Sequence, residues 1–516
     1  MKIMKQMGMI FNMDKCLGCN TCTVACKNIW TNREGAKYMF WNNVETKPGI
    51  GYPKEWENQE EYGGGWELTG KKNKPLKLKL HSKGKALFDL FYNPRQPEMG
   101  DYVNRDGTYT FTYEDLHSPK LHKQQPVARP KSEVTGEEDI PIEWGVNWED
   151  NAAGAHVTGQ WDYNFSDMSE EAHKAMLQYQ DSFMIYLPRI CNHCANPACV
   201  GACPSAAAHK REEDGVVLID QTRCRGWRYC VSACPYKKAY YNWRSGKMEK
   251  CILCYPRLES GQPPACFHSC PGRIRYMGPL LVNRDRVIEV ATAPEADLVE
   301  LHREIILDPH DPEVIAAAKE QDISESWLDA AQRSPVYKMF KEWKIAMPLH
   351  PEFRTVPSLF YVPPESPVAS SLDKGTRRSA TGGKTVLPNL EEFRVPIKYL
   401  SRLLAAGNEQ QVEQALQRQL ALRRYRRSQR VEGKPDIEVL AQVGLTADQA
   451  DQMHRLLSLA FLNERFVVPT TRREETGSSP HVERGFVGFH EMSPLSPMSR
   501  REEWHIDHHR KDKVEP

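Results

Sequence analysis

The chain has 516 residues and a formal net charge of +1, from 69 Lys and Arg against 68 Asp and Glu. This length is enough for several domains, and the balanced charge excludes a global field of the kind that attracts nucleic acid. No apolar run reaches the length that spans a bilayer, and segment 1–10 is interrupted too soon for a secretion signal. We therefore expect a protein made and kept in the cytoplasm, whose association with a membrane needs a partner.

The 15 cysteines are expected to bind metal, because disulfides are rare in large chains without a secretion signal. They form groups of four, four, three and four along the chain. The first group is Cys16, Cys19, Cys22 and Cys26, and its spacing C-x2-C-x2-C-x3-C is the bacterial ferredoxin run for an iron–sulfur cluster. Lys27 stands where that run usually has proline. We expect three of these thiolates to hold one cluster and the fourth, on the following helix, to point toward a second.

Residues 28–180 contain no cysteine and are rich in Gly, Pro, Trp, Asn and Glu. This composition predicts long irregular excursions, and loops of this length in a compact protein often form partner surface. The alternative is a disordered insertion, but the frequent Trp and Tyr residues argue against disorder.

The second and third cysteine groups lie close together in the sequence. The second reads C-x2-C-x4-C-x3-C-P, and the third reads C-x2-W-x2-C-x3-C-P, a ferredoxin run in which Trp227 replaces the second cysteine. Residues 215–220 between them predict a strand, as in the hairpin of a ferredoxin module. The cysteines are Cys191, Cys194, Cys199 and Cys203 in the second group and Cys224, Cys230 and Cys234 in the third.

The fourth group has a long spacer inside it, and the chain after about residue 290 is free of cysteine. This group consists of Cys251, Cys254, Cys266 and Cys270. Apolar periodicity then predicts a helix that opens at 395–397 and is closed by Gly407, and a second helix over 409–427. A third starts at Thr446, with Gln449 in the capping-box position. Its apolar residues are Met453, Leu456, Leu457, Ala460 and Phe461. Beyond about residue 471 the polar, Ser- and Pro-rich composition predicts a mobile tail.

The ferredoxin rule, by which the fourth cysteine of one run completes the cluster of the other, predicts the ligand sets. The second and third groups are neighbours in sequence and should share one module, which leaves the first and fourth groups for another. The expected sets are Cys16, Cys19, Cys22 and Cys270; Cys26, Cys251, Cys254 and Cys266; Cys191, Cys194, Cys199 and Cys234; and Cys203, Cys224 and Cys230. The last set has only three thiolates.

A set of three thiolates predicts a [3Fe-4S] cluster, because Trp227 cannot ligate iron. The alternative is a fourth ligand from a carboxylate or water, although no carboxylate lies within the motif. The site lacks one negative thiolate, and basic residues lie close by in sequence. Both features should favour the reduced state of its cluster and raise its reduction potential. The basic residues are Arg225, Arg228, Lys237 and Lys238, for which solvated surface and a partner contact are equal alternatives.

Zinc is the alternative metal, since C-x2-C pairs also form structural zinc sites, and a zinc-stapled assembly scaffold is the alternative class of protein. The ferredoxin spacing followed by proline favours iron–sulfur clusters. Residues 383–385 are similar to the end of a phosphate loop, but Arg378 stands where its first glycine is required, which excludes that motif. Segment 505–509 indicates a charged tail rather than a metal site. The arginines of 418–430 predict a basic helix face, either solvated or in contact with anionic lipid or a subunit.

At these motifs the sequence resembles the iron–sulfur (beta) subunit of membrane-bound respiratory nitrate reductase and its close relative in some nitrite oxidoreductases. The resemblance covers nearly the whole chain and extends beyond the cysteines, which separates this family from the shorter subunits of formate dehydrogenases or thiosulfate reductases. The matching segments are 41–49, 56–60, 210–215, 224–228, 272–276, 334–339 and 348–352. The tail after residue 471 departs most from the family.

The resemblance implies three [4Fe-4S] clusters and one [3Fe-4S] cluster, a molybdenum-cofactor catalytic alpha subunit and a membrane cytochrome b gamma subunit. By analogy, the cluster held by Cys16 and Cys270 faces the catalytic subunit, and the [3Fe-4S] cluster beside Trp227 lies nearest the haem. Electrons would run from quinol through haem and the clusters to molybdenum, where nitrate becomes nitrite. The chain itself would bind no small-molecule substrate. A nitrite oxidoreductase would run the electrons in the opposite direction, and cluster ligands do not distinguish the two.

The expected fold class is α+β, with two bacterial-ferredoxin-like modules binding four iron–sulfur clusters, long loop insertions and a helical C-terminal domain. Residues 1–40 and 246–290 should form the halves of one module (module A), and 181–245 the other (module B). Residues 41–180 form the insertion, 291–470 the helical domain and 471–516 the flexible tail. The protein is expected on the cytoplasmic face of the cell membrane, held there by its partner subunits.

Overall fold

The computed structural model describes residues 1–80 apart from 34, 37, 50, 54, 55 and 61, residues 162–165, residues 185–365 apart from 243, and residues 390–469. Most of the predicted insertion lies outside these residues, as do segments 383–385 and 505–509 and the predicted tail. Among the helices that are described, none combines the length and the apolar character needed to cross a membrane.

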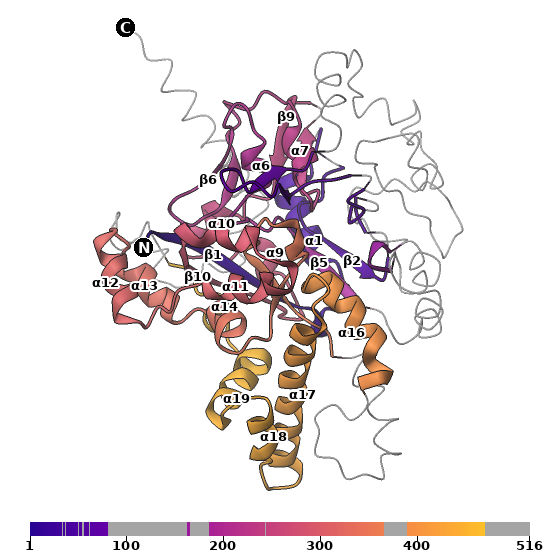
Figure 1. Ribbon diagram of the computed structural model, residues 1–516, viewed down its shortest axis with the longest axis vertical. Helices are drawn as coiled ribbons and strands as arrows, with labels where there is room; N and C mark the ends of the chain where they lie inside the picture. Colours follow the sequence, from indigo (N-terminus) through magenta and orange to yellow (C-terminus); the bar gives the residue numbers. More distant parts are fainter. Residues whose placement is uncertain are drawn as a thin grey trace.

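A four-stranded sheet at the centre of the molecule joins distant parts of the sequence (Figure 1). Its strand order is β10 (Arg275–Asn283), β1 (Ile3–Asn12), β12 (Leu359–Val362) and β11 (Met347–Pro348). β1 pairs antiparallel with β10, from Ile3↔Asn283 to Phe11↔Arg275, and parallel with β12. Most residues of β1 and β10 are buried, as expected for strands covered on both faces. The pairing brings the first cysteine group, which follows β1, beside the fourth, which precedes β10.

Two glycines allow a helical segment to approach this sheet closely. Gly8 of β1 and Gly278 of β10 lie directly opposite each other. A Cβ atom on Gly8 would lie 2.8 Å from Val336 Cγ1, closer than real side-chain contacts, and Val336 belongs to α14 (Pro335–Tyr337). The missing side chains therefore let α14 pack directly on the strands.

Short hairpins flank the third cysteine group, and the first of them follows the second group. β6 (Ala208–Lys210) pairs with β7 (Val217–Ile219), which confirms the predicted hairpin between these groups, and β8 (Ala239–Asn242) pairs with β9 (Lys247–Lys250). The helices at the cysteines are short: α1 (Thr21–Cys26), α6 (Ala198–Gly201), α7 (Tyr229–Ala233), α8 (Tyr255–Leu258) and α9 (Ala265–His268). α1 packs against α9 and α6 against α7, so the first group meets the fourth and the second meets the third.

The described part of the predicted insertion is more regular than expected. β2 (Asn43–Lys47) pairs with β5 (Ile185–Arg189), and β3 (Trp66–Leu68) pairs with β4 (Leu76–Leu78). Every residue of β2 is buried although its sequence is mostly polar, because Glu45 pairs with Arg189 and Lys47 pairs with Glu57. Buried ion pairs hide the alternation of apolar and polar residues by which a strand is recognised in a sequence.

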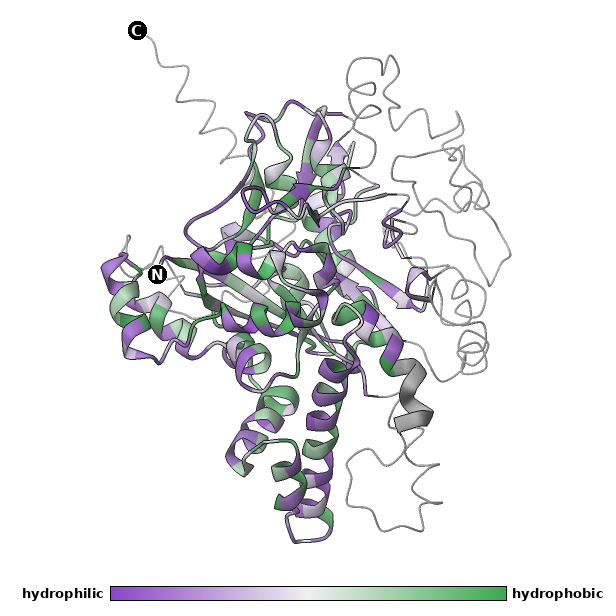
Figure 2. Ribbon diagram, in the orientation of Figure 1, coloured by the Kyte–Doolittle hydropathy of each residue, from purple (hydrophilic) through white to green (hydrophobic). Residues whose placement is uncertain are grey.

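The C-terminal helices lie where the sequence predicts them, but several of their ends differ. α16 (Leu390–Leu404) begins before the predicted start at 395, and α17 (Glu409–Val431) runs past the predicted end. α19 (Ala447–His454) has the predicted capping box between Thr446 and Gln449. With α18 (Ile437–Gln442), α17 and α19 project from the rest of the chain (Figure 1), and hydrophobic and hydrophilic residues are interleaved along them (Figure 2). Within the part of the chain that the structure describes, the remaining α-helices are α10 (Val287–Thr292), α11 (Leu298–Glu304), α12 (Pro312–Glu320), α13 (Glu325–Gln332) and α20 (Leu462–Arg465).

The predicted apolar side of the third helix is correct except at its end. Met453, Leu456 and Ala460 are buried, but Phe461 is 69% exposed. The helix continues past α19 as a π-helical turn that ends at Leu459, so Phe461 no longer follows the helical period. The prediction for Phe461 is therefore wrong.

Candidate iron–sulfur sites

Four thiols line one cavity with an empty volume of about 310 Å³, called site 1. They belong to Cys16, Cys19, Cys22 and Cys270. The turn that carries the first two needs a glycine at Gly18, because φ is +66° there and a Cβ atom would lie 2.5 Å from the Tyr186 ring. Cys19 is exposed and Leu17 is 67% exposed, so site 1 opens to the surface.

Four buried thiols form site 2. They belong to Cys26, Cys251, Cys254 and Cys266. Burial, and then the neighbouring thiols of the other three, raise the pKa of Cys26 well above its ordinary value. Trp30 Nε1 donates to Cys254 Sγ at 3.1 Å, and the Leu253 N–H donates to Cys251 Sγ at 3.4 Å. Donors of this kind favour the thiolate, which is the form that ligates metal.

Site 3 combines three thiols of the second group with one of the third. They belong to Cys191, Cys194, Cys199 and Cys234. Burial and the neighbouring Cys191 thiol raise the pKa of Cys194 to about 12, and burial together with Cys234 and Cys191 raises the pKa of Cys199. Thiols of this set therefore lie near enough to act on one another, and their assignment to one cluster stays a prediction.

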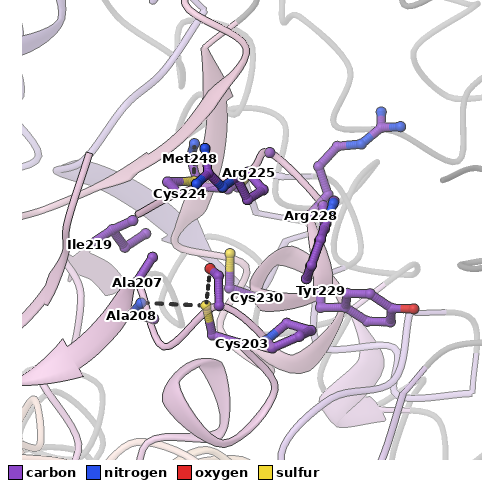
Figure 3. A pocket seen from close by; sticks show the side chains of 14 residues that line it. Cys203, Ala207, Ala208, Ile219, Cys224, Arg225, Arg228, Tyr229, Cys230 and Met248 are labelled. Carbon is purple, nitrogen blue, oxygen red and sulfur yellow. Dashed lines mark hydrogen bonds between the residues drawn. The ribbon is translucent and has the colours of Figure 1, made fainter. Parts of the chain in front are cut away.

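Site 4 is a second cavity, with an empty volume of about 320 Å³ (Figure 3). Its three thiols belong to Cys203, Cys224 and Cys230. Backbone N–H groups donate to two of them, from Ala208 to Cys203 Sγ at 3.4 Å and from Met248 to Cys224 Sγ at 3.3 Å. Trp227 also lines the cavity and is 40% exposed, so site 4 reaches the surface. Among the described residues that line this cavity, none is Asp or Glu, which argues against a carboxylate as fourth ligand.

The four sites follow one another in space. Three pairs of thiols from adjacent sites lie close enough to raise a pKa in addition to the effect of burial. The pairs are Cys22 with Cys266, Cys191 with Cys251, and Cys234 with Cys230. They join site 1 to site 2, site 2 to site 3 and site 3 to site 4. Sites 1 and 4, whose cavities reach the surface, are therefore the two ends of the series.

The donor sets fit iron–sulfur clusters. Every ligand is sulfur, and the cavities of sites 1 and 4 leave open volume among the thiols. Burial raises the pKa of Cys16 and of Cys251 to about 12, so thiolates at these places need nearby positive charge, which iron supplies. The assignment of individual cysteines to individual clusters stays a prediction.

Two expectations about basic residues near Trp227 are wrong. Lys237 and Lys238 are buried, and burial lowers their pKa values to about 8 and about 7. Lys237 Nζ donates to the carbonyls of Tyr62 and Gly63, each at 2.9 Å. These lysines are neither solvated surface nor a partner contact, because their side chains are buried. Lys237 instead joins the third cysteine group to residues 62 and 63. Arg228 is different and lies over the Tyr241 ring, 5.3 Å from its centroid.

The arginines of α17 have partners within the chain. Arg423 pairs with Asp14 and Glu365, Arg424 pairs with Asp436, and Arg426 pairs with Asp451. Arg418 donates to the carbonyls of Lys344 and Val443, each at 3.4 Å. Arg423 and Arg424 are each 53% exposed, so a solvated face agrees with the structure, and a contact with lipid or another subunit stays a prediction.

Sequence reasoning missed a set of buried charged residues. They are Lys47, Glu57, Arg275 and His350. Charged residue types predict surface, so composition and periodicity gave no sign of their burial. One signal was present, because each of the four lies in a segment that carries the family resemblance.

Comparisons with known proteins identify the family. Residues 182–280 match a 4Fe-4S dicluster domain, and residues 366–447 match the respiratory nitrate reductase beta C-terminal family. The nitrate reductase beta chain of Bacillus subtilis (strain 168) is 51% identical over 491 residues, covering 95% of this chain and 98% of that protein. The respiratory nitrate reductase 2 and 1 beta chains of Escherichia coli (strain K12) are each 50% identical, covering 95% and 92% of this chain and 93% and 91% of those proteins.

These matches confirm the family predicted from the sequence and the ferredoxin-like dicluster domain within a fold of mixed helices and strands. Members of the family are the iron–sulfur electron-transfer subunits of nitrate reductase complexes. The chain belongs to the family of respiratory nitrate reductase beta chains.

Proposed function

We propose that this chain relays electrons from a membrane cytochrome b subunit, reduced by quinol, to a molybdenum catalytic subunit that reduces nitrate to nitrite. The linear order of the four sites carries this proposal, because sites 1 and 4 open to the surface and sites 2 and 3 lie between them. Iron–sulfur clusters held in this order supply one-electron redox chemistry from one surface to another. The chain's own residues hold the ligands, exclude water and set the charge around each site.

The proposed occupants are three [4Fe-4S] clusters at sites 1, 2 and 3 and one [3Fe-4S] cluster at site 4. The three thiols of site 4 and the absence of Asp and Glu from its described lining support the smaller cluster. Trp227 takes the sequence position of the missing cysteine, lines the cavity and is 40% exposed. The backbone N–H groups of Ala208 and Met248 donate to thiolates of site 4. These hydrogen bonds and the absence of a fourth thiolate charge both raise the reduction potential of site 4.

The family resemblance supports an assignment of the two ends of the series to the two partner subunits. Site 1 would face the catalytic subunit, where the exposed Leu17 is a rim contact, and site 4 would face the cytochrome subunit beside Trp227. The complex would be peripheral on the cytoplasmic side of the membrane, with this chain held by its partners.

We also propose the domain organisation predicted from the sequence. Residues 1–40 with 246–290 form module A and residues 181–245 form module B, supported by the packing of α1 on α9 and of α6 on α7. Residues 41–180 form the insertion, 291–470 the helical C-terminal domain and 471–516 the tail.

Removing one cysteine ligand of site 3, in the middle of the series, tests the proposed electron path. In the assembled complex with Cys199→Ser, quinol should still reduce the haem, but nitrate should no longer reoxidise it at the wild-type rate. Unchanged reoxidation of the haem by nitrate would refute the proposed path. Assays of the wild-type complex with nitrate and reduced viologen, and with nitrite and an electron acceptor, distinguish nitrate reduction from nitrite oxidation.

A further inference from the structure

Arg275 is a fully buried cation at the junction of sites 1 and 2. It is the first residue of β10, is 0% exposed, and lies opposite Phe11 of β1. Its position follows directly from the central sheet, since β10 begins immediately after the loop that carries Cys270. The ligand sets of the proposed relay do not by themselves require a charged residue here.

The hydrogen-bonding capacity of Arg275 is only partly used. Nη2 donates to Asn42 Oδ1 at 2.8 Å, and the guanidinium lies 4.2 Å from the ring centroid of Phe11 and 5.5 Å from that of Phe267. Nε and Nη1 are buried and have no hydrogen-bond partner among the described residues. Two of the donors on this side chain therefore face the interior without an acceptor from the described chain.

Burial disfavours the charge of Arg275, and the groups that favour this charge are thiols of both neighbouring sites. They belong to Cys22, Cys16 and Cys270 of site 1 and to Cys266 of site 2. A guanidinium does not lose its proton in a protein, so this side chain stays positive wherever it is placed. Burying such a charge, and leaving buried N–H groups without acceptors, is unfavourable unless a negative partner is present. Thiolate-ligated sites offer both negative charge and sulfur acceptors.

We propose that Arg275 is the shared counter-charge of sites 1 and 2, and that its Nε and Nη1 hydrogens are donated to sulfur atoms held there. This inference rests on the ligand sets of the proposed function. Each site gains one negative charge when it is reduced by one electron, and the nearby cation stabilises that charge. When one electron passes between the two sites, one is oxidised and the other reduced beside the same guanidinium, so the charge that Arg275 balances stays constant.

Redox titration of the assembled complex, followed by electron paramagnetic resonance, tests the inference. Arg275→Met removes the charge, Arg275→Lys keeps it without the planar fork, and Arg273→Met removes an exposed arginine two residues earlier as the matched control. In Arg275→Met we expect the oxidised-to-reduced ratio of sites 1 and 2 at a fixed potential to rise at least tenfold, which is about 59 mV for a one-electron couple. Arg275→Lys should show a smaller shift, and Arg273→Met none. Unchanged ratios in an assembled Arg275→Met complex would overturn the inference.

A second measurement does not depend on a variant that assembles. Wild-type complex prepared with arginine labelled with ¹⁵N in the guanidinium group should show ¹⁵N coupling to reduced site 1 in pulsed electron paramagnetic resonance. Absence of that coupling would overturn the inference. Iron and sulfide analysis separates this failure from a failure of the proposed function, because wild-type complex without clusters at sites 1 and 2 would refute the ligand sets themselves.

Discussion

Replacing His350 with glutamine should remove a pH-dependent stabilisation of the buried region behind β2. His350 is buried, with Nδ1 2.7 Å from Glu352 Oε1 and Nε2 2.8 Å from Glu57 Oε1. Both ring nitrogens face carboxylates, and only the imidazolium form can donate to both. Burial alone would lower the pKa of His350, but the two carboxylates outweigh it and raise the pKa to about 9. Glu57 also pairs with Lys47, so the change reaches a network of buried charges.

The size of the effect follows from the two pKa values of His350. The folded value of about 9 against an ordinary value of 6.5 corresponds to about 3 kcal/mol of stabilisation, at 1.36 kcal/mol for each unit. Because the folded-state pKa is the higher one, this stabilisation is complete below about pH 6.5 and is lost as the pH rises through about 9. About 2 kcal/mol of it should disappear between pH 7 and pH 9.5.

Thermal unfolding of wild type and His350→Gln at pH 7 and pH 9.5 measures this loss. The difference between the unfolding midpoints of wild type and His350→Gln should be about 4 °C smaller at pH 9.5 than at pH 7. This takes about 2 °C per kcal/mol for a unit of about 200 residues. His302→Gln is the matched control, because burial lowers the pKa of His302 to about 3 and keeps it neutral throughout. Its gap from wild type should stay constant. A His350→Gln gap that is equal at the two pH values would show that His350 is neutral in the folded protein and refute the reasoning.

Three further substitutions test individual sites. Trp227→Cys supplies the missing thiolate and should convert site 4 to a [4Fe-4S] cluster of lower potential, seen as loss of the [3Fe-4S] resonance from the oxidised complex. Gly18→Ala should lower the iron content of site 1, because φ is +66° at this residue and the Tyr186 ring would lie 2.5 Å from the new Cβ atom. The control is Gly407→Ala, where φ is +83° but the space is open. It should leave the iron content unchanged and lower the stability by about 1 kcal/mol. Trp30→Phe removes the 3.1 Å hydrogen bond to Cys254 Sγ and should lower the potential of site 2 in a redox titration; an equal or higher potential would contradict the role of that donor.

The sequence predicted those features that depend on local spacing. The four cysteine groups, the hairpin before the third group, and the capping box of Thr446 and Gln449 are each encoded within a short stretch. The first cysteine group lies beside the fourth because α1 packs on α9, and the ferredoxin rule supplied this long-range constraint; the ligand sets themselves stay a prediction.

Features that depend on tertiary pairing were not predictable in the same way. The strand β2 was missed because Glu45 and Lys47 are buried through ion pairs, and the burial of Lys237 depends on carbonyls far away in the sequence. The ion pairs of Arg423 were not predicted, because its partners, Asp14 and Glu365, are brought to α17 only by the fold. A sequence gives the charge of such residues but not the partner that makes burial or pairing possible.

Electron paramagnetic resonance of the air-oxidised wild-type complex tests most directly whether site 4, with Cys203, Cys224 and Cys230, holds a cluster with three iron atoms. The account predicts a [3Fe-4S] signal that disappears on one-electron reduction at a higher potential than that at which the other sites become reduced. An oxidised complex that contains its full iron and sulfide but shows no [3Fe-4S] signal would contradict the account.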